Sequence, residues 1–296
     1  MTLRVPAAVR ALRPRQWTKN LAVFAPLLFA RAVTVPGATW HATLAFLSFC
    51  ALASGLYVVN DWVDQAQDRL HPEKKHRPIA AGEIHAFGAG ALVLGCWLVG
   101  GALAVLAGPN VGPSALAYVL VELAYTFWLK RYVIVDVLVI ATGFVLRVVG
   151  GAAAIDVPVS NWLFLCALLL ALFLALGKRR AELVSLEAPE AHGHRATLAD
   201  YSLPLLDQML TLVAATCVVA YALYTVAPDT LEKVGSDRMK FTVPFVVYGI
   251  LRYLYLLQRR GAGGAPERVL LQDRPTLLNL ALYLGTVGWV LFGRAA

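Results

Sequence analysis

The chain has 296 residues, of which 59% are hydrophobic and only 15% are charged, and its mean hydropathy is +0.66. This composition excludes an ordinary soluble domain and predicts an integral membrane protein. The net charge of +8 could suggest a nucleic-acid ligand. In a membrane protein, however, topology accounts for basic residues first, so we expect no nucleic-acid partner.

Nine apolar segments follow one another along the chain and predict an all-α fold, because the runs are continuous and do not alternate. They cover residues 21–35, 42–60, 86–107, 114–129, 132–155, 162–177, 205–227, 241–257 and 277–292. The first is the weakest, since Pro26 and Arg31 interrupt it. We expect residues 1–296 to form a single transmembrane domain.

Lysine and arginine residues are unevenly divided between the two sides that nine spans define. One set of flanks holds 20 of the 26 basic residues and the other holds 5. The positive-inside rule assigns the basic set to the cytoplasm. We therefore expect a multi-pass protein of the inner (plasma) membrane with its active site facing the cytoplasm. The basic set includes residues 61–85 and 178–204, which we expect to form cytoplasmic cap loops.

The N-terminal segment, residues 12–20, places cations, amides and Trp17 just before the first predicted span. Composition alone favours a membrane anchor, in which the basic residues contact anionic headgroups and the indole lies at the interface. The functional alternative is that Arg13 and Lys19 contact phosphate oxygens.

Three aspartates follow the second predicted span. If the helix continues, Asp61, Asp64 and Asp68 fall at positions i, i+3 and i+7 and share one face. Three carboxylates near a helix C-terminus repel one another and require a positive partner. Mg²⁺ suits such a group, since it prefers one or two carboxylates with phosphate oxygens and water. The pattern thus predicts a Mg²⁺-diphosphate site. The alternative is a solvated acidic loop end that pairs with neighbouring lysines.

Basic residues lie close to the aspartates in the sequence. Lys74 and Arg77 follow within a few residues, where they would neutralise a polyanionic substrate or simply set the topology. The fourth predicted span ends near Lys130, whose ammonium could bind phosphate or extend to the interface. Tyr125, on the same helix, could donate a hydrogen bond into a cavity.

Arg147 lies in the middle of the fifth predicted span, with no carboxylate one turn away on its own helix. Ionisable residues at such depth are costly, so we expect it to line a polar cavity; a structural salt bridge is the alternative. The sixth span ends at Lys178, Arg179 and Arg180. Lys178 could form an ordinary surface ion pair with Glu182, but three adjacent cations favour a second anion-binding site.

Several motifs of other enzyme classes are missing from the sequence. It has no glycine-rich phosphate loop, no His-Glu-x-x-His motif and no nucleophile elbow. The four cysteines each lie alone in an apolar stretch, which indicates buried thiols rather than a disulfide framework or a metal site. We therefore do not expect zinc chemistry.

The motif Asn60-Asp61-x-x-Asp64-x-x-x-Asp68 resembles the first Mg²⁺-diphosphate motif of the UbiA superfamily of intramembrane prenyltransferases. The resemblance implies nine helices around a lateral, lipid-open cavity with a cytoplasmic cap. Other blocks are similar to one branch of that superfamily, which transfers phosphoribose. These blocks are residues 13–20, 57–61, 77–82, 125–130, 177–183 and 250–253.

The candidate site combines the residue patterns with this resemblance. The catalytic candidates are Asn60, Asp61, Asp64 and Asp68, and the three aspartates are also the candidate Mg²⁺ ligands. The substrate-binding candidates are Arg13, Gln16, Lys19, Lys74, Arg77, Tyr125, Lys130, Arg147, Lys178, Arg179 and Glu182.

One departure from the wider superfamily distinguishes between its branches. Aromatic prenyltransferases usually carry a second aspartate-rich motif after the sixth span, where this chain has three cations and only Glu182. One acidic and one basic cluster suit a donor with a diphosphate at one end and a monophosphate at the other. The resemblance therefore implies transfer of 5-phosphoribose from phosphoribosyl diphosphate to a polyprenyl phosphate.

Two other functions stay open at this point. One is an intramembrane prenyltransferase that uses a prenyl diphosphate donor and an aromatic or other acceptor. The other is a transporter or channel whose pathway is lined by Arg147 and Glu122, although we find no internal repeat of the kind that transporters favour. Glycine pairs at 100–101 and 150–151 could pack within or between subunits, which leaves a homo-oligomer possible.

Overall fold

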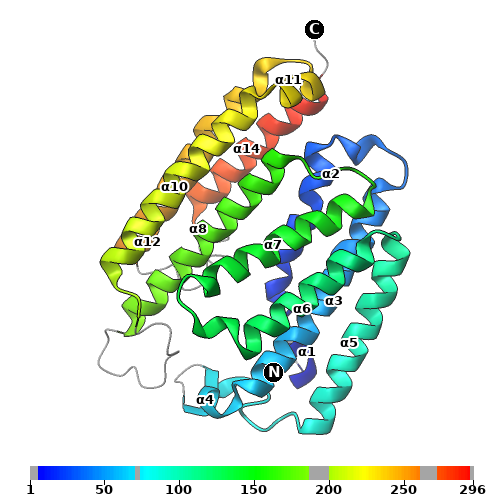
Figure 1. Cartoon of the computed structure of the whole chain (residues 1–296), viewed down its shortest axis with the longest axis vertical. Coiled ribbons are helices and arrows are strands. Elements are labelled where there is room, and N and C mark those ends of the chain that lie inside the picture. The colour runs from blue at the N-terminus through cyan, green and yellow to red at the C-terminus, as the bar shows by residue number, and fades with distance from the viewer. Residues whose placement is uncertain (1–5, 71–73, 187–199, 261–271, 294–296) are drawn as a thin grey trace. The chain divides into compact units, whose positions relative to one another are not determined.

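The computed structural model describes residues 6–70, 74–186, 200–260 and 272–293, and its secondary structure there is entirely helical (Figure 1). The chain divides into two compact units. Unit 1 contains the described residues up to Val159, and unit 2 contains those from Ser160 onward. The expected single domain over residues 1–296 stays a prediction.

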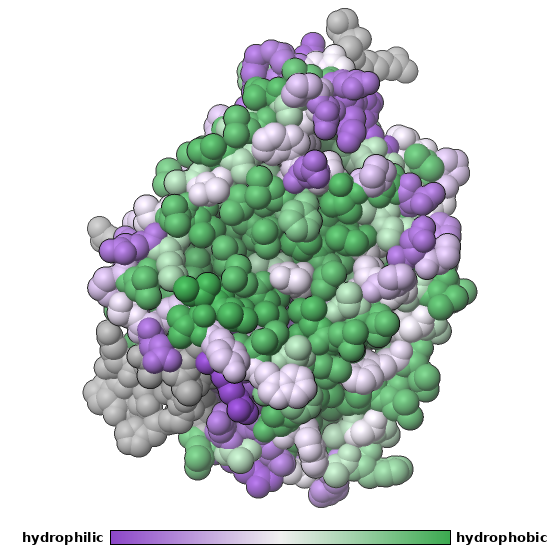
Figure 2. Space-filling model, in the orientation of Figure 1, coloured by the Kyte–Doolittle hydropathy of each residue, from purple (hydrophilic) through white to green (hydrophobic). Residues whose placement is uncertain are grey.

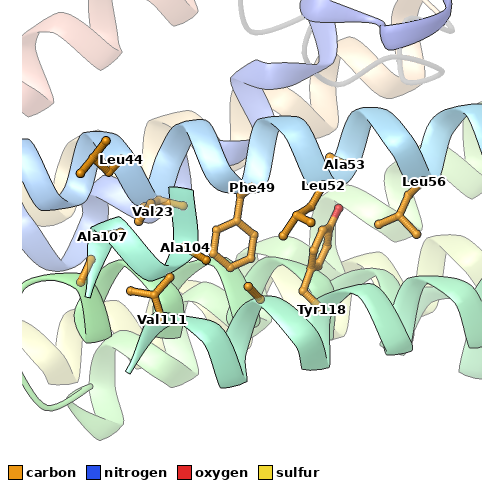
Figure 3. Packing of buried hydrophobic residues seen from close by; sticks show 13 residues of the cluster. Val23, Leu44, Phe49, Leu52, Ala53, Leu56, Ala104, Ala107, Val111 and Tyr118 are labelled. Atoms are coloured by element: carbon orange, nitrogen blue, oxygen red, sulfur yellow. The ribbon is translucent and has the colours of Figure 1, made fainter. Parts of the chain in front are cut away.

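Four long helices form the body of unit 1: α3 (Ala38–Val63), α5 (Ala86–Ala107), α6 (Val111–Phe127) and α7 (Val135–Ala154). Helix α3 packs against α5, α6 and α7, and α6 packs along α7. In the core, Phe49 of α3 points toward α6 and lies 5.4 Å from Tyr118 between ring centroids (Figure 3). Burial of this apolar cluster holds the helices together.

The N-terminal stretch of unit 1 consists of short helices: α1 (Ala7–Leu12), η1 (Pro14–Phe24), α2 (Ala25–Phe29) and η2 (Ala32–Thr34). The helix expected over residues 21–35 is therefore not continuous. Arg31 has a left-handed backbone (φ 56°), which ends a right-handed helix. Pro26 lies in the first turn of α2, where its missing N–H costs no helical hydrogen bond.

Three short helices lie in connections of unit 1: α4 (Gln65–Leu70), η3 (Lys74–His76) and η4 (Leu129–Arg131). The segment 61–85, expected to be a cap loop, thus contains the end of α3, all of α4 and all of η3. Residues 71–73 of that segment lie outside the described residues.

Unit 2 contains four long helices: α8 (Asn161–Leu186), α10 (Leu203–Val226), α12 (Val243–Arg260) and α14 (Arg274–Phe292). Helix α10 packs against α8 and α12, and α12 packs against α14. Two shorter helices, α11 (Pro228–Val234) and η5 (Asp237–Thr242), connect α10 to α12. Asp273 caps α14, because its carboxylate accepts a hydrogen bond from the backbone N–H of Thr276.

Seven helical segments in the described part of the chain are long and apolar enough to cross a membrane, and α6 is a shorter apolar helix. Large hydrophobic side chains are exposed along these helices; on α5 they include Leu94, Leu98 and Val105. Figure 2 shows that hydrophobic side chains cover most of the helix surface in view. Exposed apolar surface of this extent marks contact with lipid, so the protein is a multi-pass membrane protein.

Candidate active site

The last turn of α3 carries the first carboxylate of the acidic cluster, which comprises Asp61, Asp64 and Asp68. Asp61 is only 1% exposed. Its Oδ1 atom accepts hydrogen bonds from Arg13, which precedes η1, and from Arg77 at 3.0 Å, which follows η3. Segments far apart in the sequence therefore meet at one carboxylate.

The other two aspartates of the acidic cluster also form ion pairs. The guanidinium of Arg77 donates to Asp68 Oδ2 at 2.5 Å, so one arginine bridges Asp61 and Asp68. Helix α3 ends at Val63, with Asp64 as its C-cap. The Asp64 carboxylate contacts the ammonium of Lys130 from η4, with 2.6 Å between Nζ and Oδ1. The expected acidic cluster is thus surrounded by cations.

The cluster fits a Mg²⁺ ion bound with phosphate better than a metal held by protein ligands alone. Among the described residues, no three His, Cys, Asp or Glu side chains gather closely enough to hold a metal by themselves. Mg²⁺ usually takes one or two carboxylates and completes its shell with water and substrate phosphate. The Oδ2 atom of Asp61 is buried and has no hydrogen-bond partner within the part of the chain that the structure describes. Such an atom is costly unless it gains a ligand, and an oxygen anion is the ligand type that Mg²⁺ prefers.

The remaining candidates of unit 1 lie on α3, or on helices next to the cations that contact the acidic cluster. Gln16 and Lys19 are half-buried on η1, and Lys74 is half-buried on η3. Asn60 is half-buried on the last turn of α3, and its carbonyl oxygen accepts from the N–H of Asp64. Tyr125 is buried near the end of α6, just before η4.

Arg147 belongs to an interior network of unit 1. Its side chain is 4% exposed. The guanidinium donates hydrogen bonds of 2.7 Å to Asn20 on η1 and to Tyr118 on α6, and it also lies 4.5 Å from the centroid of the Tyr118 ring. Both partners come from other elements. Where a polar cavity was expected, the structure has side chains that hydrogen-bond to Arg147. The part of Arg147 in substrate binding stays a prediction.

The cations at the end of the sixth predicted span lie on α8 in unit 2. Arg179 is 1% exposed and pairs with Glu182. Lys178 is farther from the same carboxylate, with 3.9 Å between Nζ and Oε1. Residues 178–186 continue α8, so the expected cap segment 178–204 begins within a helix, and its role as a cap stays a prediction. Residues 187–199 of that segment lie outside the described residues.

The sequence patterns did not reveal two ion pairs of unit 2. Arg180 donates to Asp207 of α10, with 2.5 Å between Nε and Oδ1. Arg252 of α12 donates to Asp273, and this guanidinium, together with Thr276, holds the pKa of the Asp273 carboxyl well below its usual range. Each acid is distant in sequence from its arginine, so no short motif could have indicated the pair.

Comparison with known proteins gives the family. The model of the UbiA prenyltransferase family matches residues 21–271. A solved structure of a UbiA homolog from Archaeoglobus fulgidus bound to GPP and Mg²⁺ has a similar fold, with a TM-score of 0.75 and 20% sequence identity; the match covers 97% of this chain and 99% of that one. The chain belongs to the UbiA prenyltransferase family, as its motifs predicted.

Two relatives are similar over nearly the full length. A decaprenyl-phosphate phosphoribosyltransferase from Mycolicibacterium smegmatis is 33% identical, and the match covers 97% of this chain and 93% of the relative. A protein of the same name from Mycobacterium tuberculosis is 35% identical, with 96% and 94% covered. These likenesses agree with the branch that the sequence motifs indicated.

Proposed function

We propose that this protein transfers 5-phosphoribose from 5-phospho-α-D-ribose 1-diphosphate to a polyprenyl phosphate, giving polyprenyl-phosphoryl-5-phosphoribose and diphosphate. The observation that carries the proposal is the similarity over nearly the whole chain to enzymes named decaprenyl-phosphate phosphoribosyltransferase. Three cations and one acid at residues 178–182 support it, because that charge pattern suits a donor with a separate monophosphate.

The acidic cluster is our proposed site for the donor's diphosphate. Asp61, Asp64 and Asp68, with Asn60 beside them, would hold Mg²⁺ directly or through water. When bound, the metal neutralises charge that develops on the departing diphosphate. The buried, unpartnered Oδ2 of Asp61 supports this assignment. The fold is shared with a protein that was solved with Mg²⁺ bound.

The cations of the chain are our proposed ligands for phosphate oxygens. Arg13, Arg77 and Lys130 already contact the acidic cluster and would turn to the diphosphate when it binds. We also assign phosphate contacts to Lys19 and Lys74. The further substrate-binding residues in this proposal are Gln16, Tyr125, Arg147, Lys178, Arg179 and Glu182.

The acceptor needs little activation. A phosphate monoester is largely dianionic at pH 7, since its second pKa is about 6, so its oxygen can attack without a strong general base. The new bond joins that oxygen to the anomeric carbon, while the bond from this carbon to the diphosphate breaks and its electron pair leaves with the diphosphate. Positioning of charges by the site's cations would supply most of the rate.

We place the reaction at the cytoplasmic face of the inner membrane. Nine spans around a lipid-open cavity would put the polyprenyl tail in apolar surroundings and the phosphate at the rim, under a cap formed by residues 61–85 and 178–204. The uneven distribution of basic residues supports this orientation. A homo-oligomer is compatible with this arrangement.

The test is transfer of label from radiolabelled phosphoribosyl diphosphate into the lipid fraction, with mass spectrometry of the product. Asp61→Ala and Asp64→Ala should each lower turnover at least about 10²-fold, the usual scale for a lost electrostatic contact in the transition state. Glu83→Gln is the matched control, because Glu83 pairs with Arg10 on the surface of unit 1. Near-normal turnover in a purified, folded Asp61→Ala/Asp64→Ala double variant would reject the site.

The second candidate is an intramembrane prenyltransferase that uses a prenyl diphosphate and an aromatic or other acceptor. The structures of a UbiA homolog bound to GPP and to DMAPP, each with Mg²⁺, favour it as the alternative. Label that enters product from a prenyl diphosphate, and not from phosphoribosyl diphosphate, would favour this function over the first.

A further inference from the structure

The acidic cluster and its cations are balanced in charge. Among the residues that the structure describes, its three carboxylates form ion pairs with three basic side chains, Arg13, Arg77 and Lys130, each from a different short segment of unit 1. The carboxylates of Asp61 and Asp68 are 1% and 5% exposed, whereas the guanidinium side chain of Arg77 is 25% exposed. Asp61 and Asp68 therefore lie in the protein interior, and Arg77 reaches them from the more exposed side. The Asp64 and Lys130 side chains are 17% and 12% exposed, so in that pair neither partner is fully buried.

Charge balance makes the cluster unfavourable for a metal ion alone. A dication that enters it must displace a basic side chain or leave an excess of positive charge in a largely buried place, and unpaired buried charge is costly. A diphosphate that enters with the metal removes this cost, since its oxygens accept charge-assisted hydrogen bonds from the displaced cations. The same cations then serve the carboxylates in one state and phosphate in the other.

Arg77 is best placed to make this exchange. It is the arginine that bridges Asp61 and Asp68, with contacts of 3.0 and 2.5 Å. Its side chain comes from a connection after the short helix η3 rather than from a long packed helix. Movement of this one side chain would release the Oδ2 atom of Asp68. It would also remove one of the two donors to Asp61 Oδ1, which Arg13 still contacts, beside the unpartnered Oδ2 of Asp61.

We propose that Arg77 closes the acidic cluster to bare metal ions and opens it only to a metal that arrives with a diphosphate. This inference rests on the proposed function, because it assumes that the cluster binds a metal-diphosphate donor. Binding of metal and diphosphate is then coupled, and by linkage each raises the affinity of the other by the same factor. Arg77 has opposite effects on the two ligands: it opposes the metal alone and favours the metal-diphosphate complex.

The experiment measures two affinities on the purified full-length protein in detergent. Mn²⁺ replaces Mg²⁺ as a spectroscopic probe with similar oxygen ligands, and its binding without diphosphate is followed by electron paramagnetic resonance. Binding of radiolabelled inorganic diphosphate with excess Mg²⁺ is followed by equilibrium dialysis. We expect Arg77→Met to bind Mn²⁺ on the order of tenfold more tightly than the wild type, and Mg²⁺-diphosphate on the order of tenfold more weakly.

Arg10→Met is the matched control. Arg10 is an arginine of the same unit that pairs with Glu83, and both of those side chains are 40% exposed. This variant loses the same net charge, but the acidic cluster keeps its own partners, so both affinities should stay at the wild-type values. If Arg77→Met does not fold, Lys130→Met carries the same two expectations through Asp64.

Unchanged or weaker Mn²⁺ binding in Arg77→Met would overturn the proposal, because Arg77 would then orient the carboxylates instead of blocking them. Equal gains in Arg77→Met and Arg10→Met would also overturn it, since net charge alone would explain them. Neither measurement uses a polyprenyl phosphate. The two affinities therefore test the role of Arg77, and the transfer assay tests the proposed function. Each proposal can fail while the other experiment gives its expected result.

Discussion

Arg147 shows how a buried charge is stabilised in the interior of unit 1. Its guanidinium donates to the Asn20 amide oxygen and to the Tyr118 hydroxyl, and it stacks near the Tyr118 and Phe144 rings. Asn20 in turn donates to the Cys50 sulfur at 3.2 Å. One side chain of α7 thus links η1, α6 and α3, and a buried network of this kind fixes how elements pack only if all its members are satisfied.

We predict that Arg147→Met lowers the stability of the folded protein. The variant leaves buried polar atoms of Asn20 and Tyr118 without their partner, at a cost of about 1–3 kcal/mol for each. The measurement is the midpoint of thermal unfolding in detergent. Arg131→Met, at an exposed arginine of the same unit, is the control and should change little. Equal midpoints for the two variants would show that the network does not hold unit 1 together.

Residue types in the site were predictable from the sequence, whereas their partners were not. The spacing of Asp61, Asp64 and Asp68 identified the carboxylates, and nearby cations were expected because clustered acids repel one another. That Arg77 would bridge two of them depends on how the chain returns after η3. Periodicity reports which residues share a face of one helix, and it contains no information on contacts between elements such as Lys130 with Asp64.

At the scale of elements, η1 and α7 of unit 1 approach each other closely at Gly151. A β-carbon on Gly151 would overlap the backbone carbonyl of Val23 near the end of η1. Helix η1 is a 3-10 helix of eleven residues, and runs beyond three or four residues are uncommon. Tertiary contacts of this kind, rather than intrinsic preference, therefore account for the position of η1, which carries Gln16 and Lys19.

We predict that Gly151→Ala destabilises the protein by about 1–3 kcal/mol, the usual cost of overpacking, because a backbone carbonyl cannot move aside as a side-chain end can. Transfer activity should fall with it, since a displaced η1 shifts its proposed phosphate ligands. The control is Gly101→Ala on α5, where an added β-carbon has no neighbour within 4 Å. That variant should be neutral or gain up to about 1 kcal/mol from helix propensity. A Gly151→Ala protein as stable and active as Gly101→Ala would contradict the close contact.

Predicted and observed elements agree best where hydropathy and helix limits coincide. The segment 86–107 matches α5 at both ends. At the C-terminal end, Gly108 adopts a backbone (φ 148°) that stops a helix. The sixth predicted span ends at 177, yet α8 runs on to Leu186. Hydropathy detects the edge of the apolar region, and the lysine and arginine residues that follow are good helix formers. At 21–35 the error is of the opposite kind, since apolar residues there do not form one helix.

At the scale of the whole molecule, the division of basic residues is the main indicator of orientation. The flanks that contain Lys75 hold most of the lysines and arginines, while the opposite set includes the connection between α10 and α12 with Glu232. Loops rich in lysine and arginine stay in the cytoplasm during insertion. In the topology that the sequence predicts, all the candidate residues outside Arg147 lie in or next to the basic flanks, so the orientation decides which compartment supplies the donor.

We predict that Glu232→Cys reacts with a membrane-impermeant thiol reagent in intact cells, and that Lys75→Cys reacts only after the cells are permeabilised. Both positions are exposed in the structure. A difference in their labelling by the reagent therefore reports the side of the membrane on which each lies. The wild-type protein is the control, because its four cysteines are free thiols within apolar helices and should give a low background. Labelling of Lys75→Cys in intact cells would show that the protein has the opposite orientation in the membrane. It would also place the acidic cluster, which is joined to Lys75 through α4 and η3, on the side of the membrane opposite to the cytoplasmic supply of a phosphorylated sugar donor.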